Sequence, residues 1–289
     1  MLRSTAKVLI LGVFLTGCIS MSRREAPTLD YSDAVPVGFP SSVRVYGETV
    51  GAFQEASAPV FNRVHALVSG GSINTLALSG GGAGGAFGAG VLVGWSQKGD
   101  RPEFEIVTGV SVGAIIAPFA FLGEQWDPIL TEAFSGKPTE HLFQSHWRGA
   151  LLGASLYHGE PLANLIDHFI TEEVLQAVAV ESAKGRLLLV ATTDLDKEET
   201  VIWNMGVIAA QGGARALKLF RNVIVASASI PGLFPPVTIR VSKSGKTFDE
   251  MHVDGGTTAS LFIAPTLAAL LRDRMDGLHG ANEYILKNG

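Results

Sequence analysis

From residue 72 onward, short apolar runs alternate with longer segments whose apolar residues recur at helical spacing. The apolar runs predict strands at 73–79, 104–109, 186–193, 200–204 and 283–286. The longer segments predict helices at 86–97, 112–122, 126–134, 162–170, 172–182, 214–226 and 265–274. Two more strands, 237–241 and 248–253, flank Ser244-Gly245 and predict a hairpin. Alternating strands and helices predict an α/β domain with a mostly parallel sheet.

The region before this alternation has a different pattern. Residues 20–59 are rich in Pro, Ser, Gly and charge, and their prolines argue against regular elements. We interpret this stretch as a tether that ends in a short helix near 60–68. The predicted organisation is a signal peptide at 1–17, a tether or N-terminal segment at 18–70, and one α/β domain at 71–289.

The first residues have the features of a secretory signal. Arg3 and Lys7 precede an apolar run, 8–15, that is too short to span a bilayer. The next residues, 15–18, read Leu-Thr-Gly-Cys and resemble a bacterial lipoprotein signal, in which cleavage leaves a lipid-modified cysteine first. Cys18 is the only cysteine of the chain, so no internal disulfide is possible. An ordinary signal with an incidental cysteine is the alternative.

A lipidated Cys18 would anchor the mature protein firmly, because several acyl chains bind a membrane far better than one. Ile19 follows it, with no Asp at that position. By resemblance to lipoprotein sorting in Gram-negative bacteria, this indicates the cell envelope, at the periplasmic face of the outer membrane.

Composition narrows the function classes. Of 289 residues, 47% are hydrophobic and 17% charged, which allows a large core and argues against disorder. The net charge of −5 argues against nucleic acid as a partner and against electrostatic docking on anionic lipid. A membrane would therefore be reached through the N-terminal anchor.

The strongest chemical motif is Gly109-Val110-Ser111-Val112-Gly113, between the strand predicted at 104–109 and the helix at 112–122. This is a G-x-S-x-G nucleophile elbow in the context it requires. We expect a strained backbone at Ser111, and glycines at 109 and 113 because side chains there would collide across the turn. The helix N-terminus would favour negative charge beside the Ser111 hydroxyl. A Gly-Ser loop without chemistry is the alternative.

A glycine-rich loop, residues 79–90, follows the first strand of the domain. Main-chain amides of Gly80, Gly81, Gly82 and Gly85 could form an oxyanion hole. The same glycines fit the G-x-G-x-x-G pattern of dinucleotide sites, with an acid at 103 or 105. Close helix–sheet packing through small residues is a third interpretation. The nucleophile motif at the end of the next strand favours the oxyanion hole.

A candidate base comes from Asp254-Gly255-Gly256, at the end of a predicted strand. A carboxylate within hydrogen-bond reach of a serine can accept its proton. The usual Asp pKa, about 3.9, suits this poorly, but a dry pocket would raise it. An Asp-Gly turn without chemistry is one alternative, and a Ser111-Asp194-His252 triad is another. His252 lies inside a predicted strand, which favours a structural histidine, and the other histidines show no metal-ligand spacing.

The ordered set of Gly-rich loop, Ser elbow and Asp-Gly-Gly resembles the patatin-like phospholipase family from about residue 73 to at least 256. Residues 191–196 and 227–236 also resemble family segments. The resemblance implies a patatin-like three-layer α/β fold and a Ser111–Asp254 dyad, with an oxyanion hole of amides around Gly81 and Gly82. It implies hydrolysis of acyl esters of phospholipids, lysophospholipids or neutral lipids through an acyl-enzyme. Neither a metal nor an organic cofactor is implied.

Two departures from the family pattern stand out. Gly84 occupies a position where the family often has Arg or Lys, which weakens the expectation of anionic head groups. Residues 284–289 resemble a strand that in the family is followed by more chain, so we expect an incomplete C-terminal part and an uncovered sheet edge. A non-catalytic envelope lipoprotein with a degenerate hydrolase fold is the alternative that this leaves open.

Overall fold

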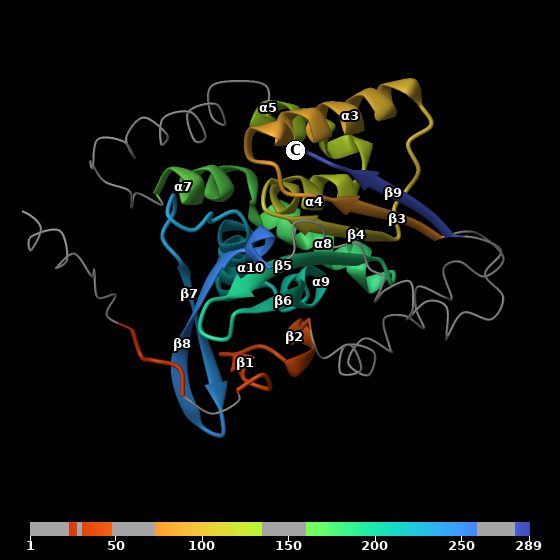
Figure 1. Ribbon diagram of the computed structural model, residues 1–289. Helices are drawn as coiled ribbons and strands as arrows, with labels where there is room; N and C mark the ends of the chain where they lie inside the picture. The colour runs from red at the N-terminus through yellow and green to blue at the C-terminus, as the bar shows by residue number, and fades with distance from the viewer. Residues whose placement is uncertain (1–22, 28–30, 48–72, 135–159, 259–280) are drawn as a thin grey trace, which may run out of the picture.

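The computed structural model describes residues 23–27, 31–47, 73–134, 160–258 and 281–289 (Figure 1). The predicted signal peptide at 1–17, Cys18, and the helices predicted at 60–68 and 265–274 lie outside the described residues. In the described part, a mixed α/β fold is built around one sheet, and helices flank it, as predicted.

One half of the sheet, from β5 to the edge strand β9, is parallel, and the other half is antiparallel. Strands β9, β3, β4 and β5 run parallel in this order, and β8, β7 and β1 continue the sheet antiparallel beyond β5. Strand β6 pairs with β5, and β2 pairs with β6. The bounds are β1 (Val35–Pro36), β2 (Arg44–Tyr46), β3 (Ile73–Leu78), β4 (Ile106–Val110), β5 (Leu187–Asp194), β6 (Glu199–Asn204), β7 (Val237–Lys243), β8 (Lys246–Asp254) and β9 (Ala281–Leu286).

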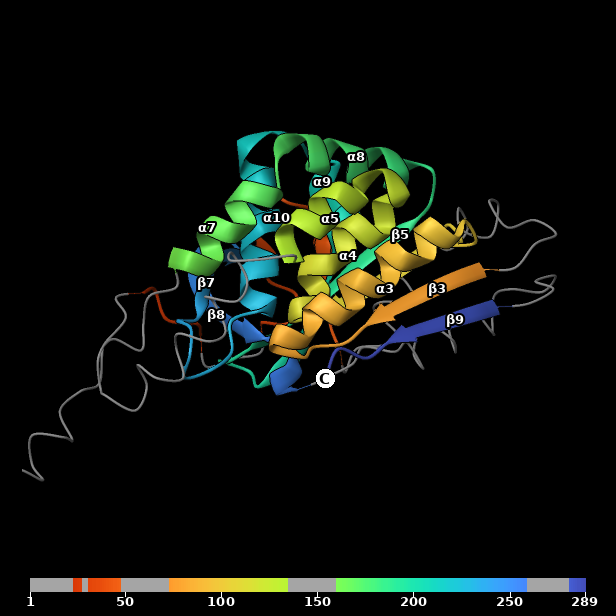
Figure 2. The same ribbon diagram turned by 90° about the horizontal axis from the view of Figure 1, so that it is seen from above.

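Seven helices of the described residues complete the fold, and Figure 2 shows them along one side of β3 and β9. They are α3 (Gly85–Lys98), α4 (Val112–Leu122), α5 (Asp127–Phe134), α7 (Glu160–Phe169), α8 (Glu172–Ala183), α9 (Met205–Ala209) and α10 (Gly213–Ser227). Single 3₁₀ turns occur at η1 (Ser41–Val43), η2 (Gly82–Gly84), η3 (Glu124–Trp126) and η4 (Gly255–Thr257). Apart from α9, the α-helices match the predicted ranges closely.

Strands β4 and β5 and helix α4 form the centre of the core. Every residue of these three elements is buried. Central parallel strands covered on both faces read as continuous apolar runs, and a helix that is apolar all round belongs in a core. The nucleophile motif therefore lies between two of the most buried elements, which fixes its backbone firmly.

The N-terminal segment contradicts one sequence-based expectation. The prediction that 20–59 lacks regular elements is wrong for 31–47, where β1 pairs with β7 and β2 pairs with β6. Val43 and Tyr46 are buried in the core. These short strands have little hydrophobic periodicity, so their pairing depends on partners far along the chain rather than on a local pattern.

The predicted hairpin is confirmed. Strands β7 and β8 pair antiparallel up to Lys243 and Lys246, with Ser244 and Gly245 between them. Both turn residues have positive φ, 50° and 78°, as two-residue hairpin turns that match the twist of the strands require. The hairpin carries Asp254 at the far end of β8.

Candidate active site

The site forms where two strands meet end to end. Strand β4 ends opposite Ala191 of β5, and β8, which runs the other way, ends with Asp254 opposite Thr192. Because β6 occupies the other edge of β5, both strands lie on the same edge. Ser111 directly follows β4, so the register alone brings residues 111 and 254 together.

The backbone at Ser111 is strained, as predicted. Its φ of 56° and ψ of −127° lie in a region that non-glycine residues rarely adopt. The Ser111 N–H donates to Ser227 Oγ at 3.0 Å, and Ser227 Oγ donates to the carbonyl oxygen of Ala191 at 2.7 Å. This chain of hydrogen bonds ties the elbow to the central strand, which offsets the cost of the strain.

The flanking glycines are required by close contacts. A Cβ on Gly109 would lie 2.6 Å from the carbonyl oxygen of Gly113. A Cβ on Gly113 would lie 2.4 Å from the carbonyl oxygen of Leu78, at the end of β3. The first collision is the one across the turn that the motif predicts, whereas the second is with a neighbouring strand.

Ser111 and Asp254 are in direct contact. Ser111 Oγ donates a hydrogen bond to Asp254 Oδ2 at 2.6 Å, and the two residues are only 6% and 5% exposed. The other carboxylate oxygen accepts the N–H of Gly256 at 2.7 Å. Burial raises the pKa of the Asp254 carboxyl, although the hydrogen bonds from Ser111 and Gly256 act in the opposite direction. A carboxylate with a raised pKa is a better proton acceptor than an exposed one.

The two glycines after Asp254 have different surroundings. A Cβ on Gly255 would lie 2.4 Å from the carbonyl oxygen of Ala191, so a side chain there would push the end of β8 off β5. A Cβ on Gly256 would lie 3.0 Å from Asp254 Oδ1, which its own N–H binds. Both glycines thus keep the carboxylate in place.

A cavity of about 680 Å³ opens over the Ser111–Asp254 pair. Since glycine has no side chain, Gly80, Gly81 and Gly82 contribute main-chain atoms to its wall. Its lining residues are Ser79, Gly80, Gly81, Gly82, Ser111, Ile230, Pro231, Asp254, Gly256, Thr257, Lys287 and Gly289. The structure therefore places three of the four candidate oxyanion glycines on the wall of the cavity that Ser111 also lines.

Gly85 does not belong to that lining. It is the first residue of α3, where a Cβ would lie 2.1 Å from Cγ2 of Val112, so it permits close packing of α3 on α4. Gly81 and Gly82 have φ values of 151° and 53°, a conformation that favours glycine. The loop thus uses its glycines for two purposes, conformation at 81–82 and helix packing at 85.

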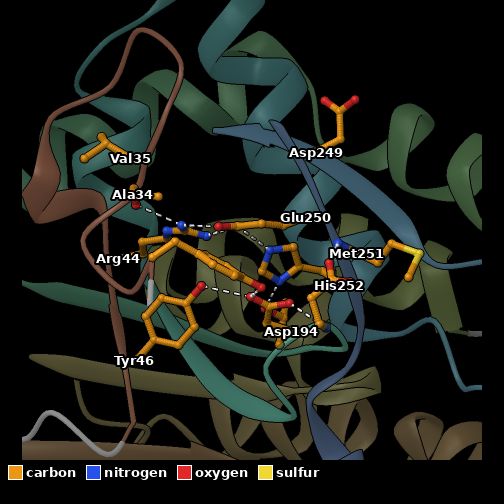
Figure 3. Close-up of polar contacts among 12 residues, drawn as sticks. Ala34, Val35, Arg44, Tyr46, Asp194, Asp249, Glu250, Met251 and His252 are labelled. Atoms are coloured by element: carbon orange, nitrogen blue, oxygen red, sulfur yellow. Dashed lines mark hydrogen bonds and ion pairs between the residues drawn. The ribbon is translucent and has the colours of Figure 1, made fainter. Parts of the chain in front are cut away.

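The residues of the alternative triad have other partners (Figure 3). His252 is fully buried, with Nδ1 3.0 Å from Thr192 Oγ1 and Nε2 3.2 Å from Glu250 Oε2. Asp194 accepts the Tyr46 hydroxyl at 2.9 Å. Among the contacts of the described residues, none joins His252 to Ser111. The structural interpretation of this histidine agrees with these contacts.

Sequence reasoning missed the buried ion pair beside His252. Arg44 from β2 binds both carboxylate oxygens of Glu250 on β8 and donates to the carbonyl oxygen of Ala34 at 2.8 Å (Figure 3). Its guanidinium lies 5.3 Å from the ring centroid of Trp203. Burial opposes ionisation of Glu250, but the hydrogen bonds from Arg44 and His252 outweigh it and lower its pKa to about 2. No local signal links two residues so far apart in sequence.

The dinucleotide interpretation of the glycine loop lacks its acid. Glu103 and Glu105 both precede β4 rather than follow its carboxyl end, where a ribose-binding acid belongs. Glu103 is exposed and forms an ion pair with Arg186, and the Glu105 carboxylate accepts the N–H of Asn74 at 2.6 Å. Neither lies on the wall of the cavity.

The described part of the chain contains neither a metal-binding cluster nor a membrane-spanning helix. Within it, no group of three or more His, Cys, Asp or Glu side chains is placed to hold a metal ion. The helices seen there are also too short or too polar for a bilayer crossing.

The sequence matches a known protein family. The family model described as "Patatin-like phospholipase" matches residues 76–267. The crystal structure of VipD from Legionella pneumophila is similar over 73% of this chain and 50% of that chain, with 15% sequence identity and a TM-score of 0.37. The chain thus spans half the length of the VipD chain. A search of curated proteins gives no match.

Proposed function

Since this chain belongs to the patatin-like phospholipase family, we propose that it is a lipid acyl hydrolase that cleaves carboxylic esters through Ser111 and Asp254. The observation that carries the proposal is the 2.6 Å hydrogen bond from Ser111 Oγ to Asp254 Oδ2, on a strained elbow beside a wall of glycine main chain. A hydroxyl, a carboxylate and main-chain amides are the groups that acyl transfer needs.

In the first half of the reaction, Ser111 Oγ attacks the ester carbonyl carbon while its proton passes to Asp254 Oδ2. The carbonyl oxygen becomes negative, and the main-chain N–H groups of Gly80 to Gly82 stabilise it. The tetrahedral intermediate then breaks its bond to the alcohol oxygen, which takes the proton from Asp254 and leaves. The acyl group remains on Ser111 as an ester.

In the second half, Asp254 accepts a proton from water, and the resulting hydroxide forms a bond with the acyl carbon. The second tetrahedral intermediate collapses, and Ser111 Oγ recovers the proton from Asp254. A free fatty acid leaves, which restores the dyad. Every proton thus passes through one carboxylate, and the raised pKa of Asp254 supports this double role.

The cavity supports a lipid ester as the substrate class. Ile230 and Pro231 add an apolar part to the wall beside the dyad, suited to an acyl chain. The proposed substrates are acyl esters of phospholipids, lysophospholipids or neutral lipids, and the ester bond is the element common to all three.

We further propose that the mature protein is a lipoprotein of the cell envelope, attached through Cys18 to the periplasmic face of the outer membrane. Cys18 lies outside the described residues, so the support is the signal-like sequence before it. Labelled palmitate should be incorporated into the wild-type protein and not into Cys18→Ser. Equal incorporation into both would contradict the anchor.

The catalytic proposal is tested with a fluorophosphonate probe, which phosphonylates activated serines. The wild-type protein should be labelled and should hydrolyse p-nitrophenyl butyrate, and Ser111→Ala should do neither. A matched control is Ser244→Gly, at the exposed hairpin turn where a positive φ suits glycine. Absence of labelling on folded wild-type protein would favour a non-catalytic envelope lipoprotein, and labelling of Ser111→Ala would place the nucleophile elsewhere.

A further inference from the structure

The chain that follows β9 binds the start of the glycine-rich loop. Strand β9 pairs with β3 in parallel from Ile73 to Leu78, and Figures 1 and 2 both show the two strands side by side. The pairing continues past the strand ends, because the Ser79 N–H donates to the carbonyl oxygen of Leu286 at 3.0 Å. Residues 287–289 therefore run beside the start of the loop.

Asn288 binds this start with both its main chain and its side chain. It is 4% exposed, its N–H donates to Ser79 Oγ at 2.9 Å, and its Nδ2 donates to the carbonyl oxygen of Ser79 at 2.7 Å. Ser79 Oγ in turn donates to the carbonyl oxygen of Gly80 at 2.6 Å. One buried residue thus fixes the two peptide groups that lead into Gly81.

The loop also fits closely around Asn288. A Cβ on Gly81 would lie 2.4 Å from the carbonyl group of Asn288. A Cβ on Gly84 would lie 1.6 Å from the Asn288 carbonyl oxygen, and one on Gly88 would lie 2.2 Å from Asn288 Oδ1. The three glycines therefore leave the room that Asn288 occupies. They come from the loop, from η2 and from α3, so the main-chain carbonyl of Asn288 lies against Gly81 and Gly84 and its side chain lies against Gly88.

We infer that Asn288 is a positioning residue, which holds the main chain of Gly80 to Gly82 where it can receive the developing oxyanion. This inference rests on the proposed function. Asn288 does not line the cavity, so it acts through the loop and not on the substrate. Preorganised amides stabilise a transition state only when their direction is fixed before the reaction.

An amide is the group that this position needs. Its Nδ2–H is the donor to Ser79, and its Oδ1 has no hydrogen-bond partner among the described residues. An ionised Asp has the same shape but no donor, so Asn288→Asp in that form removes the bond to the Ser79 carbonyl oxygen with little change in volume. Asn282, on the β9 strand that precedes Asn288, offers a matched control, because its Nδ2 donates to Asn74 Oδ1 at an exposed position at 3.0 Å.

The test compares Asn288→Asp and Asn288→Ala with Asn282→Asp and Asn282→Ala. End-point titration with the fluorophosphonate counts active sites, and kcat per labelled site is measured with p-nitrophenyl butyrate. We expect kcat per labelled site to fall about tenfold or more in both Asn288 variants. This fall should be smaller than the fall in kcat caused by complete loss of an oxyanion donor. We expect KM to stay within about twofold and both Asn282 variants to match the wild type.

The outcomes separate positioning from folding. Fewer labelled sites with unchanged kcat per site would mean a structural role only and would overturn the inference. If neither Asn288 variant folds, Ser79→Ala decides, because it removes the hydroxyl between the Asn288 N–H and the Gly80 carbonyl oxygen. It should lower kcat per site in the same way, and wild-type kcat in that variant would overturn the inference.

The inference and the function on which it rests can fail separately. A wild-type protein without turnover or labelling would overturn the proposed function and this inference with it. An active wild-type protein with equally active Asn288 variants would overturn the inference alone.

Discussion

Glu250 and Asp254 lie on the same strand, four residues apart, and both are buried, yet their pKa values move in opposite directions. Glu250 has a buried guanidinium and an imidazole as partners, whereas Asp254 has a hydroxyl and a main-chain amide. Burial raises the pKa of a carboxyl unless an opposite charge outweighs it. The neighbours of each carboxylate, and not its depth, therefore decide the direction in which its pKa moves.

The two regions also differ in what they connect. Arg44 and Glu250 join the N-terminal segment to β8 across 206 residues of sequence. Ser111 and Asp254 join two strands that meet end to end. The first region binds β8 to the N-terminal segment, and the second depends on the register of β8 for the contact between Ser111 and Asp254. A substitution at Arg44 or Glu250 should therefore appear mainly in stability measurements, and one at Ser111 or Asp254 mainly in activity measurements.

The largest expected effect separates the two carboxylates by activity. Asp254→Asn should lower kcat by about 10³–10⁴-fold, as loss of a proton acceptor does in serine hydrolases. Glu250→Gln should lower stability and leave kcat per labelled site close to the wild type. Turnover of p-nitrophenyl butyrate and urea unfolding measure the two effects. Comparable kcat in the two variants would contradict the comparison.

The next effect is on stability. Arg44→Met should destabilise the fold by about 3–5 kcal/mol, because it leaves the Glu250 charge buried without its cation. The control is Arg240→Met, which removes an exposed partner of Asp249 on the same hairpin and should have a far smaller effect. Urea unfolding at pH 7 gives both values, and equal losses would mean that the buried pair is not special.

As the pH falls, the Ser111–Asp254 pair should be affected before the Arg44–Glu250 pair. Because the folded-state pKa of Asp254 is raised above 3.8, kcat should fall as pH drops through that raised value. The contribution of Asp254 to stability has the opposite pH dependence. Because its pKa is raised in the folded state, protonated Asp254 stabilises the fold at low pH, and this contribution is lost as the pH rises through the raised pKa. Glu250, lowered from 4.5 to about 2, contributes stability above pH 4.5 that is lost toward pH 2.

Activity should therefore be lost reversibly before the structure is. Pairing a pH profile of kcat with circular dichroism at each pH checks this order. Loss of activity that coincides with unfolding would show that Asp254 does not control the acid limb.

The smallest expected effect concerns His252. His252→Ala removes contacts to Thr192 and Glu250, and it should lower kcat by less than about tenfold, against the thousandfold or more expected for Asp254→Asn. Turnover per labelled site measures both. A mild Asp254→Asn with a severe His252→Ala would instead favour the Ser111-Asp194-His252 triad.

The site was more predictable from sequence than the N-terminal part of the fold. The nucleophile elbow is a local motif, since strand, turn and helix follow one another within residues 106–122 and the close contact of Gly109 across the turn is with Gly113. The turn at Ser244-Gly245 and the buried run of β5 are local in the same sense. Such features depend on short-range sterics and periodicity, which a single sequence contains.

The features that sequence reasoning missed depend on distant partners. Strand β2 has only three residues, and nothing near Arg44 indicates that Glu250 would neutralise it. Strands β4 and β8 meet end to end because of their register on β5. The hydrophobic pattern alone does not predict this register. The glycine motif predicts Gly85 together with Gly80, Gly81 and Gly82 as oxyanion candidates, but in the structure Gly85 permits the close packing of α3 on α4.

The pairing of β3 with β9 has a consequence for how the protein is made. Ser79 and Asn288, joined by two hydrogen bonds, are 209 residues apart in the chain. At translation rates of about 5–20 residues per second, roughly 10–40 s pass on the ribosome between the synthesis of the first residue and that of the second. Ser111 is therefore synthesised long before Asn288, so the proposed hydrolytic activity should not appear until residue 288 has been made.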